Sequence, residues 1–370
     1  MSLPPMEFAS RTARLTDRFG TAAEDGDGID ALLVTSMVNI RYLTGFTGSA
    51  GILLVTPDEL LLVTDGRYGE QATAQLAAAG VSARLEISTY EQAEVVGGAV
   101  RDAGVQRLGL EAEHVTWGQL RRFTDSWFPG VELVPTRGLV EVLRRVKDAG
   151  EVARIEAAAA IADQAFELVR HRLEDGLTER EFALELDTEM RRLGAEGTSF
   201  ETIVGSGPNG ARPHLRPTDR QIRVGDLVVV DFGAVVDGYC SDMTRTLAVG
   251  EFADATQRRM VEVVLDAQAA GVAAVAAGVA ASAIDDTCRR IIAAAGWGEA
   301  FVHGTGHGVG LEIHEDPRVS KTSDAVVEAG NVITVEPGVY LPEHGGVRIE
   351  DTVVVTAEGC RALTRTPKTW

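Results

Sequence analysis

Lysine is scarce in this 370-residue sequence, which contains only Lys147, Lys321 and Lys368 among its 35 basic residues. The 55 acidic residues outnumber them and leave a formal net charge of −20 at pH 7. Nucleic-acid binding normally requires a basic face or tail, and anionic membranes attract polybasic runs. The composition therefore predicts neither a nucleic-acid partner nor a membrane partner.

Cysteine and long apolar segments are also rare. Cys240, Cys288 and Cys360 are widely spaced and form no CxxC pair, which is typical of free thiols in a reducing compartment. The longest apolar run, residues 269–281, is shorter than the roughly 20 residues that span a bilayer, so we expect a closely packed helix there. Residues 1–8 lack the basic start and apolar stretch of a signal peptide. We therefore expect a cytoplasmic protein.

Two regions with different patterns predict two domains. In residues 1–142, short apolar runs bounded by turn residues indicate strands at 31–35, 52–55, 60–63, 84–87, 107–110 and 131–134. Helical spacing falls between them at 67–79, 91–103 and 116–126, which predicts an α/β domain. Residues 143–370 begin with Ala-rich helical sequence and two capping boxes, at 148–151 and 178–181. Strands and glycine loops follow, with a helical stretch at 254–295, so we expect an α+β domain there.

Residues 205–210 match the GxGxxG pattern of dinucleotide-binding proteins and follow an expected strand at 200–204. Such a site requires a helix to begin at the glycines, so that its N-terminal amides meet the pyrophosphate. Pro208, Pro213 and Pro217 interrupt any helix at this position. We therefore expect a loop and no dinucleotide site.

Two aspartates lie on the arms of an expected hairpin. Asp231 ends the apolar strand 227–231, a turn is expected at 237–238, and Asp242 lies on the returning arm. The hairpin would bring the two carboxylates close, although their register depends on whether a bulge intervenes. Taken alone, an aspartate at a strand end is most often a turn former or a cap.

Three further residues complete a candidate metal centre. Glu336 and Glu350 follow apolar strands, and His307 lies in a glycine-rich segment, 303–310. Each also has an ordinary explanation, such as a Glu-Pro turn, an ion pair or a satisfied loop histidine. Two carboxylates about 4 Å apart repel by about 4 kcal/mol at an effective dielectric near 20. Two divalent cations would cancel this charge and activate water for hydrolysis, and oxygen-rich ligation favours Mn²⁺.

Together these residues and their flanks resemble the pita-bread metallopeptidase family, which includes methionine aminopeptidase, aminopeptidase P and prolidase. The matching blocks are 230–233, 303–310, 336–340 and 346–351. Segments 30–36, 39–48 and 64–68 resemble the creatinase/prolidase N-terminal domain, which methionine aminopeptidases lack. The resemblance spans nearly the whole chain. It implies an α/β, ribonuclease-H-like N-terminal domain followed by an α+β pita-bread catalytic domain.

The resemblance also assigns metal ligands. It implies two divalent ions per chain, with Mn²⁺ expected first and Co²⁺ or Zn²⁺ as alternatives. One ion would be held by Asp231 and the other by His307 and Glu336, while Asp242 and Glu350 would bridge both.

Further residues would act on the substrate, again by resemblance. Glu336 would handle the proton of the attacking water, and His303 and His314 would contact the substrate and stabilise the tetrahedral oxyanion. His214 would guide the substrate or shuttle protons. Arg348 would orient the neighbouring carboxylates, and Tyr340 would shape the proline side of the pocket.

Two positions next to His214 depart from the family pattern. Leu215 stands where relatives commonly have His or Tyr, and Arg212 stands where a small or apolar residue is expected. Neither is an expected ligand, so the departures bear on substrate length and not on the metal chemistry.

The resemblance leaves the activity open between two exopeptidases. The first expectation is an Xaa-Pro aminopeptidase that acts on small proline-containing peptides as a homodimer, and the alternative is an Xaa-Pro dipeptidase (prolidase). More remote alternatives are a metal-free creatinase-like amidinohydrolase and a non-catalytic pita-bread binding module. Both are expected to lack ligands, whereas this chain keeps all five.

Overall fold

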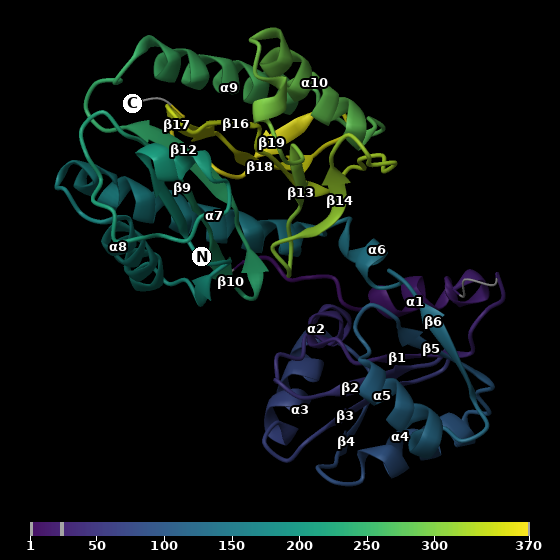
Figure 1. Cartoon of the computed structure of the whole chain (residues 1–370). Coiled ribbons are helices and arrows are strands. Elements are labelled where there is room, and N and C mark those ends of the chain that lie inside the picture. Colours follow the sequence, from purple (N-terminus) through teal and green to yellow (C-terminus); the bar gives the residue numbers. More distant parts are fainter. Residues whose placement is uncertain (1–2, 23–25, 369–370) are drawn as a thin grey trace. The chain divides into compact units, whose positions relative to one another are not determined.

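The computed structural model describes residues 3–22 and 26–368. The chain divides into two compact units, Pro5–Arg144 and Arg145–Trp370, the second together with Met1–Pro4. Each unit has its own sheets and core, and each is described separately (Figure 1). Within the described residues, no helix is long and apolar enough to cross a membrane.

The first unit is built on a mixed six-stranded sheet with the order β4-β3-β2-β1-β5-β6. Its strands are β1 (Ala31–Val34), β2 (Ile52–Val55), β3 (Leu60–Thr64), β4 (Arg84–Ile87), β5 (Arg107–Glu111) and β6 (Glu132–Thr136). Its helices are α1 (Arg11–Thr16), α2 (Met37–Thr44), α3 (Gly69–Ala79), α4 (Gln92–Asp102), α5 (Trp117–Arg122) and α6 (Glu141–Arg144), with short turns η1 (Phe19–Thr21) and η2 (Phe123–Trp127). The predicted α/β class is confirmed.

The second unit places its strands between two pairs of helices (Figure 1). The first pair is α7 (Ala149–Val169) and α8 (Glu179–Arg192), linked through η3 (Arg170–Glu174). Both helices begin at the predicted capping boxes, with Asp148 and Thr178 as the N-caps. The second pair is α9 (Ala255–Ala273) and α10 (Ala281–Ala294), followed by η5 (Gly298–Ala300). The predicted α+β class is confirmed.

Four sheets carry the strands of this unit. Strands β8 (Ile203–Ser206), β9 (Leu227–Phe232) and β12 (Met243–Ala248) form one, and β7 (Gly197–Thr198), β10 (Ala234–Val236) and β11 (Tyr239–Cys240) form another. The largest has the order β14-β13-β15-β18-β19, from β13 (Gly306–Gly308), β14 (Glu315–Val319), β15 (Val332–Val335), β18 (Asp351–Val355) and β19 (Cys360–Ala362). The last pairs β16 (Gly338–Leu341) with β17 (Gly345–Arg348).

The prediction of helix at 254–295 and 269–281 is wrong in one respect. The helical structure is interrupted between the end of α9 and the start of α10. Gly278 adopts a φ of +87°, which glycine tolerates and helices do not use. Its amide donates to Val327 O at 2.9 Å, and Ala280 forms a bridge with Val326. Pairing with residues 326 and 327 therefore overrides the apolar helical pattern.

The GxGxxG segment starts no α-helix. The expected strand at 200–204 lies slightly later, as β8, and leads into the short 3₁₀ turn η4 (Gly207–Ala211). Beyond η4 the chain runs as a loop past Pro213 to Thr218. This segment therefore lacks the helix N-terminus on which a dinucleotide site depends.

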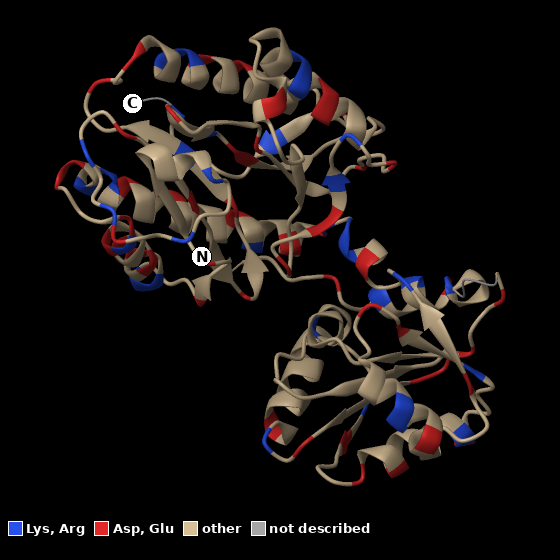
Figure 2. Ribbon diagram, viewed as in Figure 1, with Lys and Arg blue, Asp and Glu red and all other residues tan. Residues whose placement is uncertain are grey.

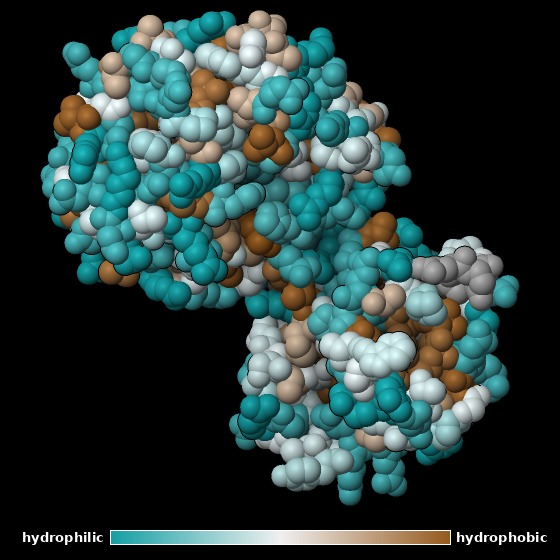
Figure 3. All heavy atoms as spheres, viewed as in Figure 1, coloured by the Kyte–Doolittle hydropathy of each residue, from teal (hydrophilic) through white to brown (hydrophobic). Residues whose placement is uncertain are grey.

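The surface carries charged residues of both signs. Figure 2 shows acidic residues scattered over the helices of both units, with basic residues among them. On the face in Figure 3, hydrophilic side chains cover most of the surface and apolar ones occur singly or in small groups. The net charge of −20 is therefore spread over both units.

Candidate metal centre

The register of the hairpin formed by β9 to β12 determines the relative positions of the Asp231 and Asp242 side chains. Phe232 pairs with Met243, and Val235 pairs with Cys240, so the register is the same on both sides of Gly233 and no bulge intervenes. Asp242 therefore lies opposite Gly233 and diagonal to Asp231, with both side chains on one face.

Two local features make this hairpin possible. At its tip, Asp237 and Gly238 both have positive φ, 44° and 71°, as a two-residue hairpin turn requires. Further down, a side chain at Gly233 would collide with the carbonyl oxygen of Ser241. The predicted turn at 237–238 is confirmed.

Glu350 adds a third carboxylate from the junction of β17 and β18. Oxygen atoms of Asp231, Asp242 and Glu350 all lie within 4.8 Å of one another. Burial raises the pKa of Asp231, and it raises the pKa values of Asp242 and Glu350 well above the ordinary carboxyl range. Three buried acids this close are unfavourable when all are ionised, so the cluster attracts positive charge.

Unpartnered oxygens at this cluster fit a cation. Among the described residues, Asp231 Oδ1 and Glu350 Oε1 are buried and have no hydrogen-bond partner. A buried carboxylate oxygen without a donor costs free energy unless a cation lies against it. The donor set is therefore suited to metal ions.

His307 and Glu336 bring a fourth carboxylate and an imidazole to the same place. His307 Nδ1 lies 2.9 Å from Gly308 O, and because a carbonyl only accepts, this nitrogen carries the proton. The other ring nitrogen, Nε2, lies 3.4 Å from Glu336 Oε1 and 3.5 Å from Asp242 Oδ2. A nitrogen held this close to two carboxylate oxygens needs positive charge beside it, which a proton or a metal ion can supply. His307 is thus oriented as a metal ligand.

Arg348 links the carboxylates to the strands behind them. It is 2% exposed, and its Nη2 donates to Asp231 Oδ2 at 2.6 Å. Its Nε donates to Thr244 Oγ1 at 3.1 Å, and its Nη1 donates to the hydroxyl of Tyr340 at 2.9 Å. The guanidinium therefore fixes one oxygen of Asp231 and leaves the other without a hydrogen-bond partner among the described residues.

Tyr340 stands behind the cavity and is not part of its lining. Its hydroxyl accepts from Arg348 and lies 2.8 Å from His303 Nε2. His303 Nδ1 lies 2.7 Å from Gly304 O, so that nitrogen donates and Nε2 accepts from the tyrosine. Both ring nitrogens of His303 are thus engaged, although the ring lines the cavity.

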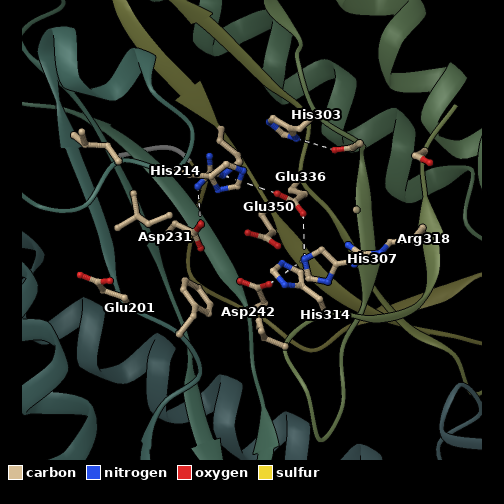
Figure 4. A pocket seen from close by; sticks show the side chains of 18 of the residues that line it. Glu201, His214, Asp231, Asp242, His303, His307, His314, Arg318, Glu336 and Glu350 are labelled. Atoms are coloured by element: carbon tan, nitrogen blue, oxygen red, sulfur yellow. Dashed lines mark hydrogen bonds and ion pairs between the residues drawn. The ribbon is translucent and has the colours of Figure 1, made fainter. Parts of the chain in front are cut away.

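The carboxylates open into a cavity of about 660 Å³ (Figure 4). The five predicted ligands point toward one another at its floor, and His214 and His314 lie beside them (Figure 4). The apolar walls are formed by Phe200, Ile203, Leu215 and Ile313. Glu201, Arg216 and Arg318 add further charged side chains to the lining.

Two threonines support the cluster without having been predicted. Thr244 Oγ1 donates to Glu350 Oε2 at 2.7 Å, and Thr334 Oγ1 donates to Glu336 Oε1 at 3.2 Å. Each lies two residues along a strand from an expected ligand, Asp242 or Glu336, and so shares its face. Strand alternation is the signal that could have identified them.

Comparison with known proteins agrees with this geometry. Residues 153–357 match the metallopeptidase family M24, and residues 16–146 match the creatinase/prolidase N-terminal domain. The chain belongs to the metallopeptidase family M24. The predicted family, the pita-bread fold and the assignment as a metallopeptidase are therefore confirmed.

Named relatives of this M24 protein align with nearly its whole length. The Xaa-Pro dipeptidase of Pyrococcus furiosus is 35% identical over 345 residues, 93% of this chain and 96% of that protein. The structure of an Xaa-Pro dipeptidase from Bacillus anthracis has a TM-score of 0.92 at 40% identity and covers 97% of this chain and 98% of that one. An X-Pro aminopeptidase from Thermotoga maritima has a TM-score of 0.87 at 35% identity, covering 97% and 99%.

Proposed function

We propose that this metallopeptidase is an Xaa-Pro dipeptidase, which hydrolyses the bond between an N-terminal residue and a following proline in dipeptides. The observation that carries the hydrolytic assignment is the convergence of four carboxylates and one imidazole on a single cavity. The sequence placed Xaa-Pro aminopeptidase first. Relatives named Xaa-Pro dipeptidase in Pyrococcus furiosus and Bacillus anthracis favour the alternative, so we reverse that order.

An arginine in the cavity wall supports the preference for dipeptides. Three arginines line the cavity, and two of them form ion pairs with carboxylates. Arg348 lies 2.6 Å from Asp231, and Arg216 lies 3.0 Å from Glu201. Among the described residues, Arg318 has no ion-pair partner. We propose that it binds the free carboxylate of a dipeptide, because a guanidinium matches a carboxylate through two parallel hydrogen bonds.

The metal-binding residues would be the five at the cavity floor. We propose that Asp231, Asp242, His307, Glu336 and Glu350 hold two divalent ions, with Mn²⁺ first and Co²⁺ or Zn²⁺ as alternatives. When bound, such ions polarise the scissile carbonyl and activate water as a nucleophile. The unpartnered oxygens of Asp231 and Glu350 support this assignment.

Glu336 is suited to move the proton of the attacking water. Burial acts to raise its pKa, but the hydrogen bond from His307 and the neighbouring positive charges hold that pKa at about 2. The carboxylate is therefore ionised at neutral pH. We propose that it accepts a proton from water and delivers it to the proline nitrogen as the peptide bond breaks.

His303 and His314 would act on the substrate as neutral groups. Burial lowers the pKa of His303, and it lowers the pKa of His314 to about 4. We propose that His314 donates its N–H to the substrate oxygen that becomes the oxyanion, and that His214 guides the substrate. Because both nitrogens of His303 are engaged, we propose that it meets the substrate through its ring and that Tyr340 acts through it.

Two further expectations accompany this function. We propose that residues 143–370 form the catalytic domain and residues 1–142 the N-terminal domain. We also propose a homodimer, as the resemblance implies, which sedimentation or light scattering will test.

An Xaa-Pro aminopeptidase remains the second candidate, favoured by the likeness to the Thermotoga maritima enzyme. The decisive experiment compares kcat/KM for Ala-Pro with that for Ala-Pro-Ala at saturating Mn²⁺. We expect the dipeptide to be strongly preferred. Equal or better cleavage of the tripeptide would establish the aminopeptidase instead, and cleavage of neither would reject both.

A further inference from the structure

An ion pair on α10, between a half-buried arginine and a buried aspartate, lies outside the lining of the substrate cavity. Arg289 Nε donates to Asp285 Oδ2 at 2.6 Å, and its Nη2 reaches Asp285 Oδ1 at 3.2 Å. Asp285 is fully buried. The two residues are four apart on one helix face, so each holds the other in place.

This pair also binds the segment that leads from α10 to β13. Asp285 Oδ1 accepts from the amide of Thr305 at 3.0 Å and from its hydroxyl at 2.9 Å. Arg289 donates to the carbonyl of Phe301 at 3.1 Å and to that of His303. The guanidinium also lies over the Phe301 ring, 4.2 Å from its centroid.

The segment so held carries groups of the active site. His303 lies between the two anchored positions, and its ring reaches the Tyr340 hydroxyl. The carbonyl of Thr305 accepts from the amide of Glu336 at 2.8 Å, and His307 follows two residues later. Backbone on both sides of His303 is therefore tied to Asp285 and Arg289.

We propose that Asp285 and Arg289 are positioning residues for the peptidase reaction, which fix the 301–305 segment and through it His303 and Glu336. This inference rests on the proposed function. Neither residue lines the cavity that contains the metal ligands, so we place neither in contact with the substrate. Their effect is on geometry, and small displacements of positioned groups reduce turnover more than binding.

The same helix offers a matched control. Arg290 and Asp286 form an ion pair with the same spacing, at 2.8 Å, but their side chains are 69% and 66% exposed. Among the described residues, neither member of this pair bonds to the 301–305 segment. The same substitutions made there alter α10 in the same way but do not affect the 301–305 segment.

The test compares Arg289→Lys and Asp285→Asn with Arg290→Lys and Asp286→Asn, on the full chain at saturating Mn²⁺. We expect kcat for Ala-Pro to fall roughly 10- to 100-fold in the first two variants, with KM within about twofold. The control variants should keep the parent kcat. In Arg289→Ala, guanidinium ion at a non-denaturing concentration should restore part of the lost kcat, because it can refill the vacated site.

A second readout needs no activity. Amide hydrogen exchange across residues 301–306 should quicken in Arg289→Lys and remain unchanged in Arg290→Lys, while the melting temperatures stay close. An unchanged kcat in both Arg289→Lys and Asp285→Asn, or an equal loss in the controls, would overturn the positioning role. If the parent protein cleaves no Xaa-Pro peptide, the proposed function fails, and the exchange measurement still decides whether the pair fixes this segment.

Discussion

Arg348 donates a 2.6 Å hydrogen bond to one oxygen of Asp231, while the other oxygen of that carboxylate is buried without a partner. The arginine thus divides the carboxylate into a fixed oxygen and a free one. The free oxygen is buried and is available to a metal ion. The orientation of Asp231 therefore depends on the guanidinium group of Arg348.

Replacing this arginine by lysine tests that dependence. Arg348→Lys keeps the charge but cannot reach Asp231, Thr244 and Tyr340 together. We expect Mn²⁺ affinity to fall by about 10- to 100-fold, as is usual when a partner of a metal ligand is lost. Calorimetric titration of the metal-free variant measures this, and parent-like affinity would show that Asp231 needs no such support.

Asp242 is expected to be indispensable for metal binding. Asp242→Asn removes a negative charge but keeps the shape of the side chain and the β9–β12 hairpin. We expect the variant to fold, to bind less metal than the parent and to hydrolyse Ala-Pro only at background level. Circular dichroism and metal analysis provide the controls. Full activity with parent metal content would mean that the ligand assignment is wrong.

Arg318 is expected to bind the free carboxylate of the substrate. In the parent protein, Ala-Pro should be a better substrate than Ala-Pro-amide, which lacks that charge. Arg318→Ala should raise KM for Ala-Pro and leave the amide nearly unaffected, so that the two substrates become similar. The measurement is the ratio of kcat/KM values for the pair. A ratio that Arg318→Ala does not change would remove the structural argument for dipeptide preference.

Metal binding is expected to release protons. Burial raises the folded-state pKa values of Asp242 and Glu350 above their ordinary values of 3.8 and 4.5. Below those raised pKa values, these carboxyls hold protons in the metal-free protein that the metal must displace, so Mn²⁺ affinity should rise with pH. Calorimetry in buffers of different ionisation enthalpy counts the protons, and zero release would contradict the prediction.

The same shifts predict how pH affects the stability of the metal-free protein. A carboxyl with a raised folded-state pKa binds its proton more tightly in the folded than in the unfolded state. Its contribution to stability is complete below the unfolded pKa and is lost as pH rises through the folded pKa. The melting temperature of the metal-free protein should therefore fall as pH rises. The increase in melting temperature on adding Mn²⁺ should become larger over the same range.

Much of this architecture followed from local sequence. The caps at Asp148 and Thr178 and the turn at Asp237 and Gly238 depend on residues next to one another in the chain, so the sequence identified them. The family resemblance identified five residues that the structure brings to one cavity, although they come from distant strands.

What the sequence did not predict depends on tertiary contacts. The break between α9 and α10 arises from pairing of Gly278 and Ala280 with a segment almost fifty residues away. Tyr340 was expected to shape the proline side of the pocket, and its contacts there, between His303 and Arg348 behind the cavity, could not be predicted. A side chain's partners across strands cannot be read from its neighbours in the chain.

The most direct test of the central claim is the hydrolysis of Ala-Pro by the same sample before metal removal, after chelation and after Mn²⁺ is restored. Release of free proline is measured at each stage, with residual metal determined by elemental analysis. We predict that activity disappears with the metal and returns with it. Undiminished hydrolysis by verified metal-free protein would contradict the account.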